Sequence, residues 1–311
     1  MEQISNVMKI FPQDIRRLLE SLPLNADKLQ EIRLRCGRPL ILVCQNREYM
    51  VGEGGRTVDR PEEAFTVTKS HLKDTMEYLS SYSMYAFEDE IRQGFLTIQG
   101  GHRVGLAGKI VADGMNIRTM KSISFLNIRL SHEIKGCAEP LLPYLYDGQQ
   151  MRHTLLFSPP RGGKTTILRD LIRLISDGNR YAPGKNVGVV DERSELGACY
   201  LGIPQNDLGM RTDILDCCPK AVGMMMLIRS MSPEVIAVDE IGSREDMEAI
   251  EYAIHCGCRM LATVHGSTVE ELRTKPAVRQ LLDSGCFERL ILPDQGKAQI
   301  FDGKGKKIYG I

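Results

Sequence analysis

The fold is decided by the apolar segment Thr154 to Phe157 and the loop that follows it, Ser158-Pro159-Pro160-Arg161-Gly162-Gly163-Lys164-Thr165. The loop matches the pattern G-x-x-x-x-G-K-[ST] at every fixed position except the first, where Ser158 replaces glycine. We expect a strand before the loop and a helix, Thr165 to Ile175, after it. Backbone N–H groups and a helix N-terminus then face one small volume, which suits a polyphosphate. The pattern therefore predicts a phosphate-binding loop.

The chemistry of the loop residues predicts ATP and Mg²⁺ as cofactors. Gly162 and Gly163 let the backbone approach the phosphates, because neither carries a Cβ atom. Lys164 is expected to reach the β and γ oxygens, and Thr165 to ligate Mg²⁺. We predict that ATP is bound by the loop and the next hydroxyl residue: Ser158, Pro159, Pro160, Arg161, Gly162, Gly163, Lys164, Thr165 and Thr166.

Two pairs of acidic residues directly follow apolar runs. Val235 to Val238 precedes Asp239 and Glu240, and Val187 to Val190 precedes Asp191 and Glu192. Ligands bind beyond the carboxyl ends of parallel strands, so these acids are candidates for the same site. Asp239 is predicted to hold Mg²⁺ and Glu240 to polarise the attacking water, with Glu192 as a second catalytic candidate. The alternative is that such acids cap helices or solvate loops.

A histidine and several arginines are further candidates. The predicted strand Arg259 to Val264 delivers His265 to the same edge, where it is a candidate catalytic residue that senses the γ-phosphate. A structural histidine is the alternative. Any of four arginines in this half could serve as an arginine finger across a subunit boundary, although each one singly is better explained as a surface or salt-bridge residue: Arg193, Arg211, Arg229 and Arg244.

The length of 311 residues fits two domains, because single cores stop growing near ~250 residues. From His153 onward strands alternate with helices, which implies a parallel sheet with crossover helices. We predict an α/β protein: a smaller α+β N-terminal domain at residues 1–135, a linker at 136–150, and a domain with a predominantly parallel sheet at 151–311.

The composition excludes some classes of protein. Forty basic residues balance 40 acidic ones, so no global field attracts nucleic acid, and none is expected as a partner. The longest apolar runs fall far short of the ~20 residues that cross a bilayer. Nine cysteines at irregular spacings indicate reduced thiols rather than a disulfide framework. We therefore expect a cytoplasmic protein.

The order of these motifs resembles that of the type II and type IV secretion ATPases, the traffic-ATPase branch of the RecA-like fold. The phosphate loop is followed by an acidic box at 190–195, then the segment 227–241, then Thr263-Val264-His265. That family commonly has glycine before the Walker B glutamate and arginine two residues after it. Asp239 and Gly242 occupy those positions here, so the role of the family's arginine cannot be assigned to Gly242.

Within this branch the chain resembles the stage III sporulation protein AA family of spore-forming Firmicutes. The resemblance extends to the first half, through Glu31 to Leu40, Gly101 to Gly108 and Ser122 to Arg129. It implies an ATPase with a RecA-like P-loop domain that assembles into a cytoplasmic ring, with a hexamer as the expected form. It also implies peripheral association with a membrane-embedded channel complex between mother cell and forespore.

Two questions stay open at the level of sequence. The first half is rich in arginine, which could close a nucleotide site by domain movement or from a neighbouring subunit, or could coat a solvated face: Arg33, Arg35, Arg38, Arg103 and Arg129. The second question is whether the chain is a RecA-like nucleic-acid translocase. Such a protein needs a basic path with aromatic residues, and the sequence has no Trp, although Lys304, Lys306 and Lys307 lie near its end.

Overall fold

The computed structural model describes residues 7–23, 25, 28–80, 87–294 and 297–310. The chain divides into two compact units, Met1–His132 and Glu133–Ile311. The segment from residue 133 onward, which includes the predicted linker, therefore belongs by its contacts to the second unit. Within the described residues, no helix combines the length and apolar character needed to span a membrane.

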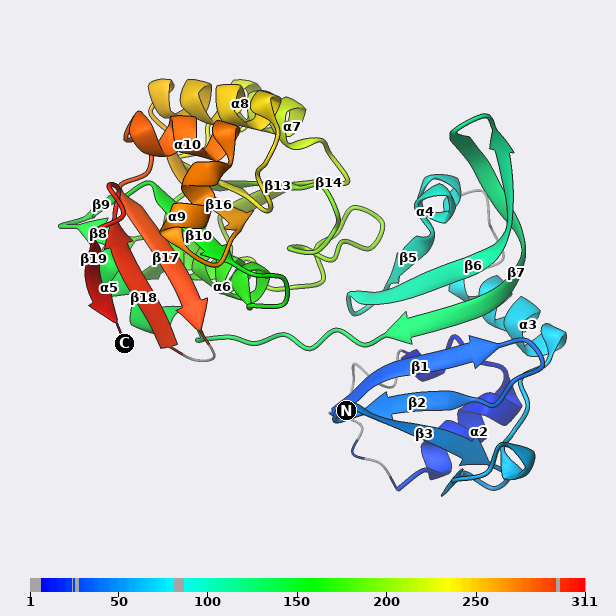
Figure 1. Ribbon diagram of the computed structural model, residues 1–311. Coiled ribbons are helices and arrows are strands. Elements are labelled where there is room, and N and C mark those ends of the chain that lie inside the picture. The colour runs from blue at the N-terminus through cyan, green and yellow to red at the C-terminus, as the bar shows by residue number, and fades with distance from the viewer. Residues whose placement is uncertain (1–6, 24, 26–27, 81–86, 295–296, 311) are drawn as a thin grey trace. The chain divides into compact units, whose positions relative to one another are not determined.

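The first unit is an antiparallel sheet with helices, as expected for an α+β domain (Figure 1). Its strands follow the order β4-β3-β2-β1-β7-β6-β5, so that β1 pairs with the distant β7. The strands are β1 (Leu29–Arg35), β2 (Ile41–Cys44), β3 (Arg47–Gly52), β4 (Arg56–Val58), β5 (Phe95–Ile98), β6 (His102–Asp113) and β7 (Asn116–Arg129), and the main helices are α2 (Gln13–Ser21), α3 (Lys69–Leu79) and α4 (Glu88–Gln93).

Alternation of side chains gives this sheet one buried and one open face. Ile32 and Leu34 of β1 are fully buried, as is their neighbour Ile128 on β7. The residues that alternate with them along β1 point to the other face, because successive side chains of a strand lie on opposite sides: Glu31, Arg33 and Arg35. The hydrophobic core of the unit therefore lies on one side of its sheet.

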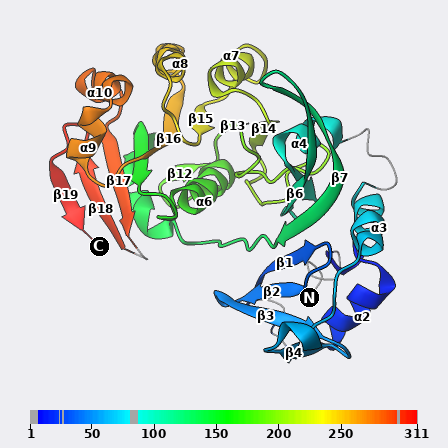
Figure 2. The ribbon, with the colours of Figure 1, turned by 45° about the vertical axis from the view of Figure 1, so that its right-hand side comes forward.

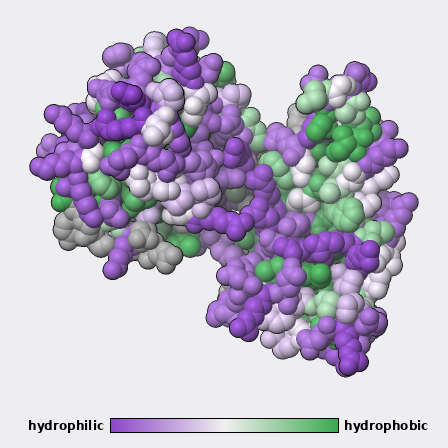
Figure 3. All heavy atoms as spheres, in the orientation of Figure 1, coloured by the Kyte–Doolittle hydropathy of each residue, from purple (hydrophilic) through white to green (hydrophobic). Residues whose placement is uncertain are grey.

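The long hairpin β6–β7 contains an irregularity in its pairing. Strand β6 continues past Gly108 to Asp113, and the register between β6 and β7 shifts at Gly108, opposite Ser122. A Cβ on Gly108 would lie 2.8 Å from the Cα atom of Ile123, so this close approach requires glycine. Beyond Gly108 the hairpin carries three exposed large apolar side chains: Ile110, Met115 and Ile117. Figure 3 shows hydrophobic surface, in green, mixed with hydrophilic surface at this end of the first unit.

The second unit contains the predicted parallel sheet, extended by an antiparallel edge that we did not predict. The strand order is β14-β13-β15-β16-β10-β17-β18-β19, and every pair from β14 to β17 is parallel. Its strands are β10 (Thr154–Ser158), β13 (Val187–Asp191), β14 (Thr212–Asp216), β15 (Val235–Val238), β16 (Arg259–His265), β17 (Arg289–Asp294), β18 (Lys297–Asp302) and β19 (Lys307–Gly310). Strand β14 was not predicted either.

Helices cover both faces of this sheet (Figure 2). On one face α6 packs Leu168, Leu171 and Ile175 against the sheet, and on the other face lie Leu227 of α7 and Ile250 of α8. The helices of the unit are α5 (Leu142–Leu145), α6 (Lys164–Asp177), α7 (Lys220–Ser230), α8 (Arg244–His255), α9 (Val269–Thr274) and α10 (Pro276–Asp283). Because both faces are buried, the central strands are continuous apolar runs rather than alternating ones.

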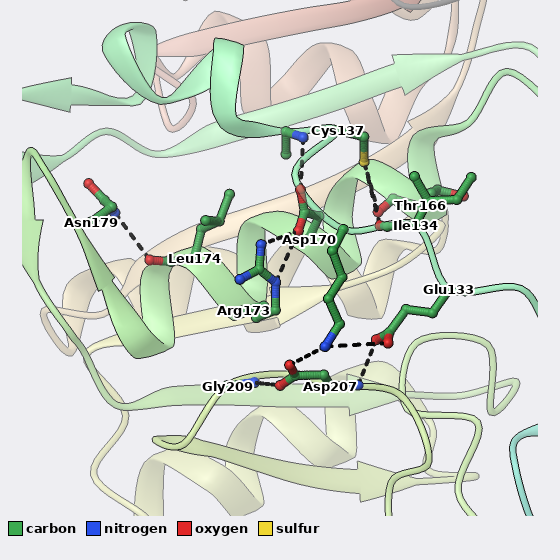
Figure 4. Close-up of polar contacts among 12 residues, drawn as sticks. Glu133, Ile134, Cys137, Thr166, Asp170, Arg173, Leu174, Asn179, Asp207 and Gly209 are labelled. Carbon is green, nitrogen blue, oxygen red and sulfur yellow. Dashed lines mark hydrogen bonds and ion pairs between the residues drawn. The ribbon is translucent and has the colours of Figure 1, made fainter. Parts of the chain in front are cut away.

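Polar contacts fasten the first residues of the second unit to α6 and to the loop at 207–209 (Figure 4). The backbone N–H of Ala138 donates to the buried carboxylate of Asp170 at 2.8 Å, and Arg173 also bonds to Asp170. Lys135 lies 2.5 Å from Asp207, whose backbone N–H donates to Glu133. The side chain of Asp170 is only 1% exposed, so its bonds are the ones most strongly protected from water.

Asp170→Ala should destabilise the second unit. The change leaves the buried N–H of Ala138 without an acceptor and removes the partner of Arg173, and losses of this kind cost about 3 kcal/mol. The unfolding midpoint, measured by circular dichroism on heating, should fall by roughly 6–12 °C, at about 2–4 °C per kcal/mol. The control is Asp147→Ala, which breaks only a surface pair with Arg152 and should shift the midpoint little. Equal shifts in both variants would contradict the assignment.

Candidate nucleotide site

The phosphate loop has the backbone conformation that its sequence requires. Ser158 ends β10 as a buried strand residue, and its φ is not positive, so this first position of the pattern does not need glycine. Arg161 and Gly163 have φ of 64° and 82°, in the left-handed region. A Cβ on Gly162 would lie 2.6 Å from the Ser158 hydroxyl, so only glycine fits there. The loop then enters α6 at Lys164.

Parallel pairing brings the predicted motifs to one edge of the sheet. Ser158 at the end of β10 pairs with His265 at the end of β16. Val238, the last residue of β15, pairs with Ala262 on the other side of β16. The phosphate loop, the pair Asp239–Glu240 and His265 therefore lie together, as we predicted from their positions at the carboxyl ends of parallel strands.

Asp239 joins three elements. Thr165, in the first turn of α6, donates its hydroxyl to Oδ2 of Asp239 at 2.8 Å. The hydroxyl of Thr263 on β16 donates to Oδ1. These hydrogen bonds fix the Asp239 carboxylate beside the Thr165 hydroxyl, and these two oxygen groups are hard ligands of the kind that Mg²⁺ prefers.

Glu240 is held by three basic groups. Its Oε1 atom lies 3.3 Å from the Lys164 ammonium and 2.8 Å from Nε2 of His265, and Oε2 lies 2.7 Å from Arg193. Partial burial by itself raises the pKa of the Glu240 carboxyl, but His265, Lys164 and Arg193 together outweigh this effect and lower the pKa below its ordinary value. Glu240 is therefore ionised at neutral pH.

The backbone of Glu240 is strained. Its φ of 54° lies in the left-handed region, which costs a non-glycine residue of order 1–3 kcal/mol. The N–H of Glu240 donates to the Thr263 hydroxyl at 2.8 Å, and this bond helps to hold the strained conformation. The contacts of the Glu240 carboxylate with Lys164 and His265 are thus made from a strained backbone conformation.

Three side chains of the acidic box make three different kinds of contact. Asp191 is 2% exposed and accepts backbone N–H bonds from Glu195, Leu196 and Gly197, which folds the box onto itself. Glu192, a predicted catalytic residue, is paired with Lys220 at the start of α7. Arg193 supplies the contact between the box and Glu240.

The other predicted arginines are placed differently. Arg211 donates to the carbonyl of Ser176, Arg244 pairs with Glu248 on its own helix, and Arg229 is exposed on α7. In the first unit, strand register places four arginines on the open face of the sheet, where Arg33 is paired with Glu31 and Glu48 and Arg103 lies over the Phe95 ring: Arg33, Arg35, Arg103 and Arg129.

A cavity of about 500 Å³ adjoins the phosphate loop on its apolar side. The segment that follows residue 133 forms one wall, and the β17–β18 strands form another. Its lining is mostly apolar, with two basic residues, Arg161 and Lys297: Ile134, Cys137, Pro140, Leu141, Pro159, Pro160, Arg161, Gly162, Gly163, Thr166, Ile167, Pro293, Lys297 and Ala298. The cavity has the size and character of a small-molecule site.

The family model described as "Sporulation stage III, protein AA" matches residues 1–309. The chain is also 38% identical over 311 residues to the stage III sporulation protein AA of Bacillus subtilis (strain 168), and the match covers 98% of this chain and 97% of that one. The chain belongs to the sporulation stage III protein AA family. The resemblance drawn from the motifs is thereby confirmed over nearly its whole length.

Solved structures share the fold of this family member. The Legionella pneumophila ATPase DotB matches with a TM-score of 0.57 at 14% identity, over 94% of this chain and 78% of that chain. The pilus retraction motor PilT, solved with bound ADP, matches with a TM-score of 0.58 at 14% identity, over 92% of this chain and 77% of that chain. At such low identity the likeness concerns the fold alone, and it confirms the predicted RecA-like P-loop architecture.

Sequence reasoning missed two residues that organise the site. Thr263 bonds to both Asp239 and Glu240, and its place in Thr263-Val264-His265 could have indicated this, because side chains two apart on a strand share a face. No local sequence pattern indicates that Lys220 pairs with Glu192. It lies 28 residues further along the chain and meets Glu192 only through the packing of α7.

Asp191→Asn should remove a pH-dependent part of the stability. Burial raises the pKa of the Asp191 carboxyl to about 6, although three backbone N–H groups oppose the shift. Between pH ~4 and ~6 the folded protein retains a proton that the unfolded chain has lost, so the contribution of Asp191 to stability falls as the pH rises. Urea unfolding at pH 4, 5, 6 and 7 should show the parent losing stability relative to the variant across this window. A constant difference would contradict this interpretation.

Proposed function

We propose that this chain binds ATP and Mg²⁺ at the edge described above and hydrolyses ATP to drive movement in a membrane-embedded channel complex of sporulation. One observation carries the proposal: Lys164, Glu240 and His265 are in mutual contact, beside the bonded pair Thr165 and Asp239. The residue types and their spacing at this edge are those that phosphoryl transfer needs.

The residues present fit a magnesium ion. Thr165 and Asp239 would hold it, because their oxygen atoms already lie side by side and both belong to groups that ligate Mg²⁺. When bound, the ion would neutralise negative charge on the phosphates. Thr263 would position the carboxylate of Asp239 through its hydrogen bond to Oδ1.

The loop fits a nucleoside triphosphate. Its backbone N–H groups and the start of α6 would bind the phosphates, and the Lys164 ammonium would pair with the β and γ oxygens. The γ-phosphate would then compete with Glu240 for Lys164, which lies 3.3 Å from Oε1 of Glu240. The apolar cavity beside the loop suits the base and ribose, because it borders Gly162, Gly163 and Thr166.

Glu240 is the proposed base. Its carboxylate is ionised and lies at the edge where the γ-phosphate would end, so it can accept a proton from a water molecule. The water oxygen attacks the γ-phosphorus as the bond to the bridging oxygen breaks, which gives ADP and orthophosphate. His265 would sense this change, because it contacts both Lys164 and Glu240. Glu192, paired with Lys220, would support the acidic box and stays the second candidate for the base.

The proposed assembly is a cytoplasmic homo-oligomer, a hexameric ring, bound to the membrane through protein partners. Family membership supports a role in sporulation, and the relatedness of fold to DotB and PilT supports a motor. An arginine from a neighbouring copy would complete each site in such a ring. Adding single-stranded DNA to the ATPase assay tests the translocase alternative, for which a saturable stimulation of several fold would be required.

Lys164→Ala should abolish hydrolysis and weaken ATP binding, because the variant loses the ammonium that meets the β and γ phosphates. Removal of one such contact lowers the rate by ~10²-fold or more. Turnover is measured by phosphate production, and binding by a fluorescent ATP analogue. The matched control is Lys185→Ala, which removes a surface partner of Glu234 in the same unit and should leave both unchanged. Turnover within about threefold of the parent would exclude this site.

Glu240→Gln should separate binding from chemistry. The amide keeps the size of the side chain but cannot act as a base, so ATP should bind near the parental affinity and be hydrolysed at least ~10²-fold more slowly. Glu192→Gln is the paired variant, and it should retain more activity because it touches Lys220 rather than Lys164. If Glu192→Gln is the slower enzyme while Glu240→Gln turns over normally, the base lies in the acidic box and the two roles are reversed.

A further inference from the structure

A second cavity, of about 420 Å³, lies beside Glu240 and away from the phosphate loop. Residues from four segments line it: Arg193 of the acidic box, Glu240 to Gly242, Val264 and His265, and Lys275 to Val278. Glu240 and His265 line this cavity and also contact Lys164, whereas Lys164 is not part of the lining. The two side chains therefore stand between the Lys164 ammonium and the cavity.

The charge of the lining favours an anion. Arg193, Lys275 and His265 provide three basic groups, against the single carboxylate of Glu240. Both oxygens of that carboxylate already accept bonds from basic groups, so its negative charge is largely neutralised. The Arg193 side chain is 63% exposed, which leaves its guanidinium room to turn from Glu240 toward a ligand. A guanidinium is well suited to phosphate oxygens.

The backbone around the cavity adds to these side chains. Lys275 precedes α10, and its ammonium donates to the carbonyl of His265, which keeps a positive charge at the wall. Ala277 and Val278, in the first turn of α10, line the cavity, and first-turn N–H groups have no acceptor within their own helix. The positive end of the helix dipole reinforces the attraction that Arg193 and Lys275 exert.

We propose that this cavity is a binding site for inorganic phosphate, through which the orthophosphate formed by hydrolysis leaves the enzyme. The inference rests on the proposed ATPase function. On the side of the phosphate loop, the bound ADP would still block the release of orthophosphate. On the other side Glu240 and His265 form a gate, and beyond it the basic lining receives the ion. Arg193 exchanges its bond to Glu240 for one to phosphate, which opens the gate as the product passes.

Gly242 allows a direct test of the route. A Cβ on Gly242 would meet no described atom within 4 Å, and its φ is not in the left-handed region, so a larger side chain can extend into the cavity. In the full-length Gly242→Leu protein, rapid chemical quench should show hydrolysis within about twofold of the parent, while a fluorescent phosphate sensor shows release at least ~5-fold slower. Gly242→Ala, too small to fill the cavity, should release phosphate as the parent does.

Lys275 allows a test of the site that needs no turnover. Orthophosphate should raise the unfolding midpoint of the ADP-saturated parent in a concentration-dependent way. In Lys275→Gln about tenfold more orthophosphate should be needed for the same rise, because a charged hydrogen bond is lost. Arg279→Gln, whose side chain pairs with Asp283 on the same helix, is the control and should match the parent.

The outcomes separate this inference from the proposed function. If hydrolysis occurs but release is unchanged in Gly242→Leu, or orthophosphate stabilises the parent and Lys275→Gln equally, the exit site is excluded and the ATPase stands. If orthophosphate does not stabilise the ADP-bound parent at all, the site is excluded whatever the turnover. If the parent hydrolyses no ATP, or Lys164→Ala hydrolyses it normally, the proposed function itself fails. Should Gly242→Leu not fold, the Lys275 series decides.

Discussion

Everything at the candidate site depends on the parallel register of three strands. Because Ser158 of β10 pairs with His265 of β16, and Val238 of β15 pairs with Ala262, the residues that follow these strands must meet at one edge. A slip of one residue along β16 would turn Thr263 to the opposite face and away from Asp239. Close packing of the buried side chains against the helices on both faces of the sheet holds this register. The apolar core thus determines where the polar chemistry lies.

On this scaffold one carboxylate is shared by several basic groups. Glu240 contacts Lys164 from α6, His265 from β16 and Arg193 from the acidic box, so it links three segments that come from distant parts of the chain. Phosphate oxygens carry the same sign of charge as Glu240 and would compete for the same partners. A ligand that binds Lys164 would therefore leave Glu240 with His265 and Arg193 as its remaining basic partners.

The sequence predicted the residues at this edge but not their pairing. Strand order and the pattern of loop, acids and histidine were sufficient to bring Lys164, Asp239, Glu240 and His265 together, because apolar runs and strand ends are local features. That Glu192 bonds to Lys220 depends on how α7 packs, and no local pattern contains this information. The same reason applies to β18 and β19, since an antiparallel edge is defined by the neighbour with which each strand pairs. Strand β17 is different, because its apolar run Leu290-Ile291-Leu292 is a local signal that we overlooked.

Helix α6 connects the site to the rest of its unit. Its first turn holds Lys164 and Thr165, Arg169 donates to the carbonyls of Glu195 and Leu196 in the acidic box, and Asp170 accepts from Ala138. These residues lie within two turns of one helix, and a helix moves as a rigid element in a close-packed core. A displacement of the first turn therefore has to carry the acidic box and the segment at 133–138 with it, or break buried hydrogen bonds. A buried donor or acceptor that loses its hydrogen-bond partner costs about 1–3 kcal/mol, so movement of these segments together with α6 requires less free energy than breaking the bonds. Through its polar contacts, α6 thus couples a displacement at the phosphate loop to the segment at 133–138, where the unit begins.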